Sequence, residues 1–315
     1  STPAFVKERF HKDGSPIRYK HVVAGRFYTA ALTEKGRVAI FGEGLEVDDL
    51  IAGFMLRLGD ISPDEKVKQM AAGQEHLLLL TDQNKLYAVG SGHQGKLGLA
   101  RNLVEAPEER ALEPNLRRVV RTAALNRGAR APGKVAVANP SEKIVQIAAG
   151  GNHSAYVTAD GHLYTWGGCT SGELGLGKFI RSIPKPTRVT LPTATPFALN
   201  VSCGKAHTAV LTTCGRIVTF GSSAFKQDGK RHKFWATTTP QEIFLGELAG
   251  HNEDITFVVC GGRHSAVMDV NSELFSFGDP LACGRTLRMS AAGSGFMPRR
   301  VPINEDASGF RLHSF

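Results

Sequence analysis

Four histidines in this chain stand at matching places, and imidazole is both a common metal ligand and a common acid–base catalyst. Each of them follows a glycine by three residues: His76, His153, His207 and His264. A tetrahedral metal site needs its ligands about 2 Å from one ion, whereas equal positions of a repeat lie a whole unit apart. We therefore expect each ring to satisfy a backbone group beside a glycine turn, which is a structural role.

A second candidate is the G-x-G-x-x-G spacing of a dinucleotide-binding loop, formed by Gly90, Gly92 and Gly95 after an apolar strand. Such a loop must lead directly into a helix. Here HQGKLGLARN follows instead, and the spacing of glycines 90, 95 and 98 recurs at glycines 167, 172 and 175. We interpret these glycines as turn residues of a repeat, so we expect no bound cofactor.

The five cysteines include no C-x-x-C pair, which predicts neither a disulfide scaffold nor a zinc site and favours a reducing, intracellular compartment. Cys203 and Cys260 directly precede two of the recurring glycines, where small apolar residues fill a crowded strand. No nucleophile elbow, Cys–His–acid set or pair of catalytic carboxylates is visible in the sequence. The sequence thus predicts no catalytic, cofactor-binding or metal-binding residue, and a protein that is not an enzyme.

All these residues belong to a repeat of five gapless segments of 18 residues. The opening glycines of the five units are Gly25, Gly73, Gly150, Gly204 and Gly261, and a closing glycine stands 17 residues after each. Successive opening glycines are 48, 77, 54 and 57 residues apart. Five gapless matches indicate a repeat architecture, which must be identified before any fold is assigned.

Each unit has the pattern of two strands joined by a tight turn. In the third unit, Ala155 and Val157 alternate with polar residues before a turn at residues 159–161, and Leu163 and Thr165 continue the pattern after it. Glycine or asparagine is expected at the turn position that requires a positive φ. A further apolar strand precedes several units. Short strands repeating at this period predict an all-β propeller that forms one domain over residues 1–315.

The order of these motifs resembles the blades of the regulator of chromosome condensation family. A blade of that family runs as a short apolar strand, small–small–Gly, two residues, His, a hairpin, aromatic–Gly and a Gly-x-Leu-Gly turn. The pattern is best kept in residues 144–177 and next best in residues 69–100. The resemblance implies a propeller whose full ring has seven blades. Five blades are explicit here, and whether the complete ring has five, six or seven stays open, because FMPRRVPI (296–303) resembles the start of a further blade.

Positive charge is concentrated in the widest gap of the repeat. The net charge is +9, and a basic insertion at about 115–141 contains no acid. Its cations are Arg117, Arg118, Arg121, Arg127, Arg130 and Lys134. Unpaired arginines are too costly to bury, so we expect this segment, which includes a short helix, to project from one face and contact an anionic partner.

Two smaller basic stretches accompany the insertion. One joins Lys226, Lys230, Arg231 and Lys233 to Phe234 and Trp235, and the other contains Arg285, Arg288, Arg299 and Arg300. Aromatic residues beside basic loops suit RNA better than the grooves of a duplex. Within the first stretch we expect RNA contacts from Lys230, Arg231, Lys233 and Trp235.

The sequence favours a non-catalytic scaffold that docks on a protein partner in a larger assembly, with RNA or another polyanion as a further partner. A ribonucleoprotein, ribosome-like particle is the expected setting, and mitochondrion and nucleus both stay open. The family resemblance implies an alternative, a guanine-nucleotide exchange factor for a small GTPase or a chromatin-binding protein. No run of 18 apolar residues predicts a membrane span.

Overall fold

The computed structural model describes residues 16–42, 45, 54–55, 64–99, 129–224, 235–243, 255–279, 281–283 and 299–300. These residues form five antiparallel sheets of four strands each. The described part contains one short 3₁₀ helix, η1 (His93–Gly95), and no helix long and apolar enough to cross a membrane. The prediction of an all-β propeller is confirmed.

Within every sheet the four strands pair in chain order, so each sheet is an up-and-down meander. The first sheet contains β1 (Tyr19–Ala24), β2 (Tyr28–Thr33), β3 (Val38–Gly42) and β4 (Phe54–Met55). The second sheet contains β5 (Val67–Ala72), β6 (His76–Thr81), β7 (Leu86–Gly90) and β8 (Ala129–Lys134). The third sheet contains β9 (Ile144–Ala149), β10 (His153–Thr158), β11 (Leu163–Gly168) and β12 (Ser182–Val189). The fourth sheet contains β13 (Ala198–Cys203), β14 (His207–Thr212), β15 (Ile217–Ser222) and β16 (Ala236–Ile243). The fifth sheet contains β17 (Ile255–Cys260), β18 (His264–Asp269), β19 (Leu274–Gly278) and β20 (Arg299–Arg300).

The hairpin between the second and third strands is the same in all five blades. In the third blade His153 lies opposite the closing Gly167, and each other closing glycine lies opposite the matching residue of its own blade. The residue at the turn has a positive φ throughout: Gly36 (76°), Asn84 (61°), Gly161 (75°), Gly215 (71°) and Ser272 (63°). The predicted hairpins and their turn positions are therefore confirmed.

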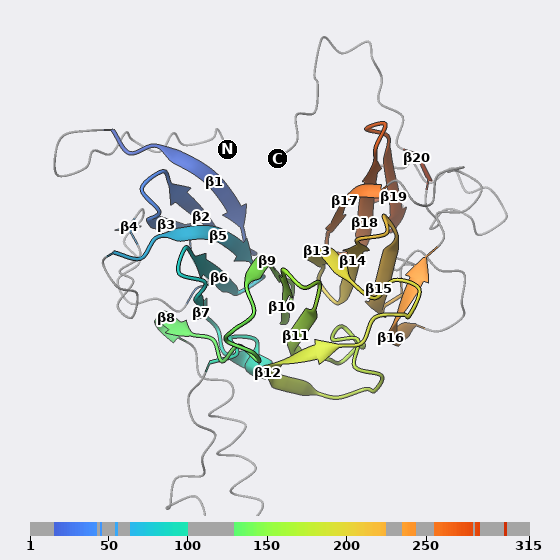
Figure 1. The fold of residues 1–315 in the computed structure, drawn as a ribbon. Helices are drawn as coiled ribbons and strands as arrows, with labels where there is room; N and C mark the ends of the chain where they lie inside the picture. Colours follow the sequence, from blue (N-terminus) through green and yellow to red (C-terminus); the bar gives the residue numbers. More distant parts are fainter. Residues whose placement is uncertain are drawn as a thin grey trace, which may run out of the picture.

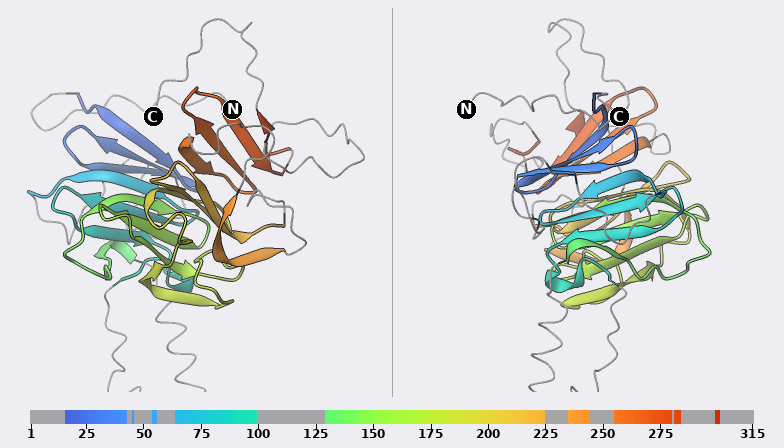
Figure 2. Two further views of the ribbon diagram at one scale, coloured as in Figure 1. Left: turned by 45° about the vertical axis from the view of Figure 1, so that its right-hand side comes forward. Right: turned by 90° about the vertical axis from the view of Figure 1, so that its left-hand side faces the viewer.

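The core lies between neighbouring blades. Successive side chains of a strand point to opposite faces, so Leu77 and Leu79 of β6 pack on the first sheet, while Leu78 and Leu80 pack on the third. Two further apolar clusters join the third sheet to the fourth and the fourth to the fifth. Every residue of β6, β10 and β14 is consequently buried. Figure 2 shows the sheets stacked face on face in this way.

The five blades follow one another around an arc, from the first (blue) to the fifth (red) (Figure 1). Residues 299–300 pair with Phe275 and Ser276 of β19 and so form the outer strand of the fifth blade. The prediction that residues 296–303 begin a further blade is therefore wrong for these residues. The outer strand of a blade is separated from its hairpin by a long connection, and in sequence it looks like the first strand of the next unit.

Up-and-down strands give the propeller two distinct ends. At one end lie the turns from first to second strand (residues 25–27, 73–75, 150–152, 204–206 and 261–263) and the connections from third to fourth strand. We call this end the loop face. At the other end, the hairpin face, lie the turns from second to third strand and the connections between blades.

Candidate functional site

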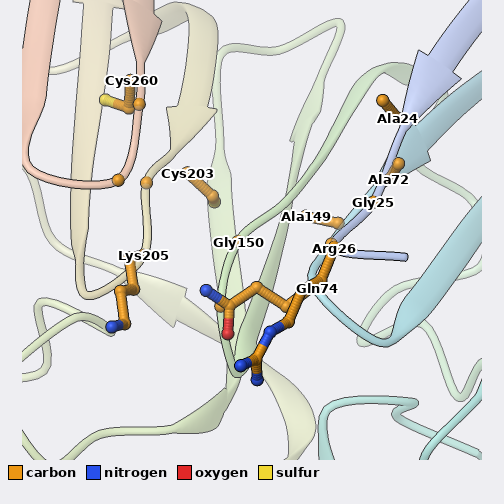
Figure 3. A pocket seen from close by; sticks show the side chains of 15 residues that line it. Ala24, Gly25, Arg26, Ala72, Gln74, Ala149, Gly150, Cys203, Lys205 and Cys260 are labelled. Carbon is orange, nitrogen blue, oxygen red and sulfur yellow. The ribbon is translucent and has the colours of Figure 1, made fainter. Parts of the chain in front are cut away.

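The turns of the loop face converge on a pit of about 250 Å³. All five opening glycines line it, together with the small residues that precede them: Ala24, Ala72, Ala149, Cys203 and Cys260 (Figure 3). Each opening glycine lies directly after the first strand of its blade. Because its walls are backbone and small side chains, the pit itself offers few groups for chemistry.

Close approach of neighbouring blades explains why the opening position is glycine. A Cβ on Gly150 would lie 2.4 Å from the carbonyl oxygen of Gly204 and 2.5 Å from Cε1 of His153. Backbone bonds run between the same turns, since the Gln74 N–H donates to the Gly150 oxygen (3.1 Å) and the Gly151 N–H to the Gly204 oxygen (3.1 Å). Any side chain at this position would force two backbones apart.

The repeat histidines bridge one blade to the next. His76, His153 and His207 are fully buried, and Nε2 of each lies 2.9–3.0 Å from a hydroxyl of the following blade: Ser154, Thr208 and Ser265. The Thr208 hydroxyl donates its own hydrogen to the Glu173 carbonyl, so Nε2 of His153 carries the proton and donates to Thr208. The sequence did not predict this hydroxyl, which the second strand of the next blade supplies.

Burial keeps these histidines neutral. Desolvation lowers the pKa of His153 to about 4 and, with added repulsion from His153 and His264, that of His207 to about 3. Burial, with Lys96 and His153 nearby, also holds the pKa of His76 well below its usual value. Burial likewise raises the pKa of the Cys260 thiol to about 11. In the described part of the chain no group of three His, Cys, Asp or Glu side chains could hold a metal ion.

The Gly-x-Leu-Gly turns of the second and third blades reach across to the next blade. The carbonyl oxygen of Lys96 accepts hydrogen bonds from the Ser154 hydroxyl and the Trp166 indole, both at 2.9 Å. The buried Lys96 ammonium lies 3.3 Å from a carboxylate oxygen of Glu75 and 3.1 Å from the amide oxygen of Asn152. Sequence analysis missed this lysine, whose only signal was a charged residue inside a glycine-bounded turn.

Charge differs between the two faces. On the described loop face the cations are Arg26, Lys96, Lys178, Arg181, Lys205 and Arg263, and all but Lys96 are exposed. The acids there are three: Glu75, whose side chain is 40% exposed, the half-buried Asp279 and the buried Glu173. The described hairpin face balances Arg18, Lys35, Arg37, Lys66, Lys85, Lys134, Lys143, Arg188 and Arg216 against Glu34, Asp64, Glu65, Asp82, Glu142, Asp160, Glu242, Asp269 and Glu273. The loop face therefore carries the positive potential.

Two of these cations stand at the mouth of the pit. Arg26, Gln74 and Lys205 each follow an opening glycine and extend from the same side of the pit (Figure 3). The Arg26 guanidinium lies 4.8 Å from the centre of the exposed Phe27 ring, which is a cation–π contact. Sequence analysis missed these residues, because the position after the opening glycine varies from unit to unit.

The residues predicted to bind RNA are only partly placed. Outside the described residues lie Arg117, Arg118, Arg121, Arg127, Lys230, Arg231 and Lys233. Arg130 and Lys134 belong to β8, the outer strand of the second blade, and Lys134 is exposed at its hairpin-face end. Val135 is part of the core. The predicted insertion therefore cannot project as a whole to residue 141, because residues 129–134 within it form the outer strand of a blade. Trp235 is exposed and precedes β16.

Topology relates the three basic stretches to one another. Each begins after the third strand of its blade and runs into the fourth: from β7 into β8, from β15 into β16 and from β19 into β20. The third strand ends and the fourth begins at the loop face. In the third blade a backbone bond from the Gly168 N–H to the Asn152 oxygen (2.7 Å) joins the end of the third strand to the turn between the first two strands. The described strand ends on either side of each stretch therefore lie at the positive face.

Comparison with known families gives matches within this repeat. The model of the regulator of chromosome condensation (RCC1) repeat matches residues 160–211, and a second model of that repeat matches residues 67–96 and 144–173. The X-linked retinitis pigmentosa GTPase regulator of Canis lupus familiaris is 29% identical over 267 residues, which is 68% of this chain and 23% of that protein. The chain spans less than a quarter of the length of the first curated relatives that it matches.

Solved structures share the fold. Human WBSCR16 superposes with a TM-score of 0.71 at 23% identity, over 93% of this chain and 73% of that one. Prp20p of Saccharomyces cerevisiae gives 0.65 at 18% identity, over 91% of this chain and 64% of that one. The family resemblance inferred from the sequence is confirmed: the chain is a propeller of regulator of chromosome condensation repeats.

Proposed function

We propose that this regulator of chromosome condensation propeller is a non-catalytic docking scaffold whose loop face binds RNA in a ribonucleoprotein assembly. The observation that carries the proposal is the charge of that face, whose described residues include six cations, five of them exposed, against three acids. A surface of one sign attracts polyanions and raises their rate of association. Protein partners of the same assembly would contact the remaining surface of the propeller.

Further support comes from the groups that could have done chemistry. Burial holds His76, His153 and His207 neutral, and each of them bridges two neighbouring blades, so these three are unsuited to proton transfer at neutral pH. Cys169, Cys203, Cys214 and Cys260 are free thiols, in keeping with a reducing compartment. Whether that compartment is the mitochondrion or the nucleus is decided by imaging the tagged chain in cells.

Salt-dependent binding tests this function. The purified chain should bind single-stranded RNA with an affinity that falls linearly on logarithmic axes as salt rises. Each neutralised phosphate contributes a slope of about 0.7 for a single strand. Binding that is absent at low salt, or that does not change with salt, would show that the loop face does not dock on RNA.

A second function is favoured by the relatives. One of them is named a GTPase regulator, and the Prp20p structure is described with that protein's binding to Gsp1p and histones. Exchange requires no covalent chemistry, because a protein surface can displace nucleotide by competing for the loops that hold it. Stimulated nucleotide release from a panel of small GTPases, together with histone binding, separates this function from RNA docking.

A further inference from the structure

Two large aromatic side chains stack on each other in solvent instead of entering the core. Phe179 and Trp235 are each 59% exposed, and their rings lie nearly parallel, with centroids 5.5 Å apart and planes inclined by 19°. Phe179 precedes β12 of the third blade and Trp235 precedes β16 of the fourth. Both residues therefore lie on the loop face, where two blades meet.

Backbone contacts hold this pair in place. The connection before β12 crosses onto the fourth blade, where the Gly177 N–H donates to the Thr238 oxygen (2.8 Å). Trp235 is fixed from its own blade, because its carbonyl oxygen accepts the N–H of the buried Ser223 (2.7 Å). The arrangement is thus set by the blades before any ligand binds, and preorganised groups lose little entropy on binding.

The charges beside the pair indicate what it binds. Lys178 and Arg181 flank Phe179 and are exposed, and residues 174–182 contain no acid. An apolar protein segment would cover the rings but would leave these two cations without partners. A single-stranded nucleic acid supplies both a planar base and a phosphate in every nucleotide. A duplex does not, because its bases are stacked on one another.

We propose that Phe179 and Trp235 form a stacking platform for the bases of single-stranded RNA, with Lys178 and Arg181 contacting the adjacent phosphates. The platform rests on the proposed docking function and specifies it, since it adds the strandedness of the RNA and the place where its bases lie. A positive face alone would bind any polyanion, whereas a stacking platform distinguishes unpaired bases from phosphate alone.

Intrinsic fluorescence can test the platform directly. The chain has two tryptophans, and Trp166 is fully buried with its indole bonded to the Lys96 carbonyl. Changes on adding ligand therefore report mainly on Trp235. The probes are a short single-stranded RNA of mixed sequence, the same sequence as a duplex, and inorganic polyphosphate. The single strand should quench Trp235, and polyphosphate should leave its emission unchanged.

Two variants and one control separate the contribution of the rings from that of the charges. Phe179→Leu and Trp235→Leu should each weaken binding of the single strand about tenfold, the scale of one lost base–aromatic stack. Binding of polyphosphate should not change, and the melting temperature should stay that of the wild type. The matched control is Phe197→Leu, because Phe197 is 48% exposed on the hairpin face and should leave all three affinities unchanged.

The outcomes separate the platform from the broader function. If the wild type binds the single strand but neither variant weakens it, the platform is overturned and RNA docking stands. Equal losses for polyphosphate and RNA would also overturn it, since the rings would then only support the charged loop. If no probe binds, the proposed docking function itself has failed.

Discussion

The loop face and the hairpin face use the same residue, glycine, for different physical reasons. On the hairpin face Gly161 supplies a positive φ of 75°, and the second blade meets that need with Asn84. On the loop face Gly150 supplies the absence of a side chain, because a Cβ would lie 2.4 Å from the next blade's backbone. Backbone bonds join neighbouring blades at both faces, since the Ala198 N–H donates to the Gly161 oxygen (2.9 Å) on the hairpin face. The turn position nevertheless carries a side chain in two blades, Asn84 and Ser272, whereas the opening position is glycine in all five.

The largest effect should come from adding one methyl group at the centre of the loop face. Gly150→Ala should destabilise the protein by about 3 kcal/mol, because the blocking atom is backbone and cannot rotate away. Chemical denaturation measures the change. The control is Gly177→Asn, which should cost about 1 kcal/mol or less, because Gly177 has a φ of 78°, which Asn tolerates, and an added Cβ would lie 3.8 Å from its nearest neighbour. Equal costs for the two substitutions would contradict the distinction between the two uses of glycine.

Acid should weaken the network between the blades. Folded His153 has a pKa of about 4, against about 6.5 in an unfolded chain, so the unfolded state binds more protons between these values. Stability contributed by this residue is complete above pH 6.5, falls as pH drops from 6.5 to 4, and is constant below. The loss should be on the order of a few kcal/mol.

His153→Gln provides the control for this titration. Denaturation across the same pH range should show a shallower decline in the variant, which lacks the titrating ring but keeps a donor for Thr208. A variant with the same pH profile as the wild type would mean that other groups govern acid sensitivity.

A smaller effect should follow from neutralising the carboxylate beside the buried lysine. Glu75→Gln removes the charge that lies 3.3 Å from the Lys96 ammonium, while Asn152 keeps its contact. Because Glu75 is partly exposed, we expect a loss of about 1–2 kcal/mol, less than for a fully buried pair. The hairpin-face control is Asp160→Asn, an exposed site that should stay within about 0.5 kcal/mol. An unchanged melting temperature in Glu75→Gln would remove Lys96 from the interblade network.

Sequence reasoning predicts the part of this fold that is local. Glycine and apolar periodicity give the hairpins, and the regular spacing gives the propeller, because both depend on residues close in the chain. Thr208 lies 55 residues from His153, while Glu75 and Asn152 lie 21 and 56 residues from Lys96. No local pattern encodes that these groups meet.

The candidate site shows the same division. Trp235 stands out in sequence because it adjoins a basic stretch. Phe179 can be recognised as its stacking partner only in the structure, where the third blade's connection crosses to the fourth blade. Similarly, the basic stretches are visible in sequence, but their common anchorage at one face follows from the order of strands. Lys134 was misplaced because the charge pattern gave no sign that β8 runs through the end of the basic segment.

The most direct test of the central claim compares equal charge changes on the two faces. The loop-face variant carries Arg26→Gln, Lys178→Gln and Lys205→Gln, and the hairpin-face variant carries Arg18→Gln, Lys66→Gln and Lys143→Gln. All six side chains are exposed, and each variant loses one arginine and two lysines. Both variants should keep the melting temperature of the wild type.

Binding of single-stranded RNA across a range of salt concentrations is then measured for both variants. We predict that the loop-face variant binds at least about tenfold more weakly, with a salt slope flattened by up to about 2 for three lost phosphate contacts. The hairpin-face variant should bind within about twofold of the wild type. Equal weakening of the two would show that net charge, and not the loop face, determines binding, and would contradict the account.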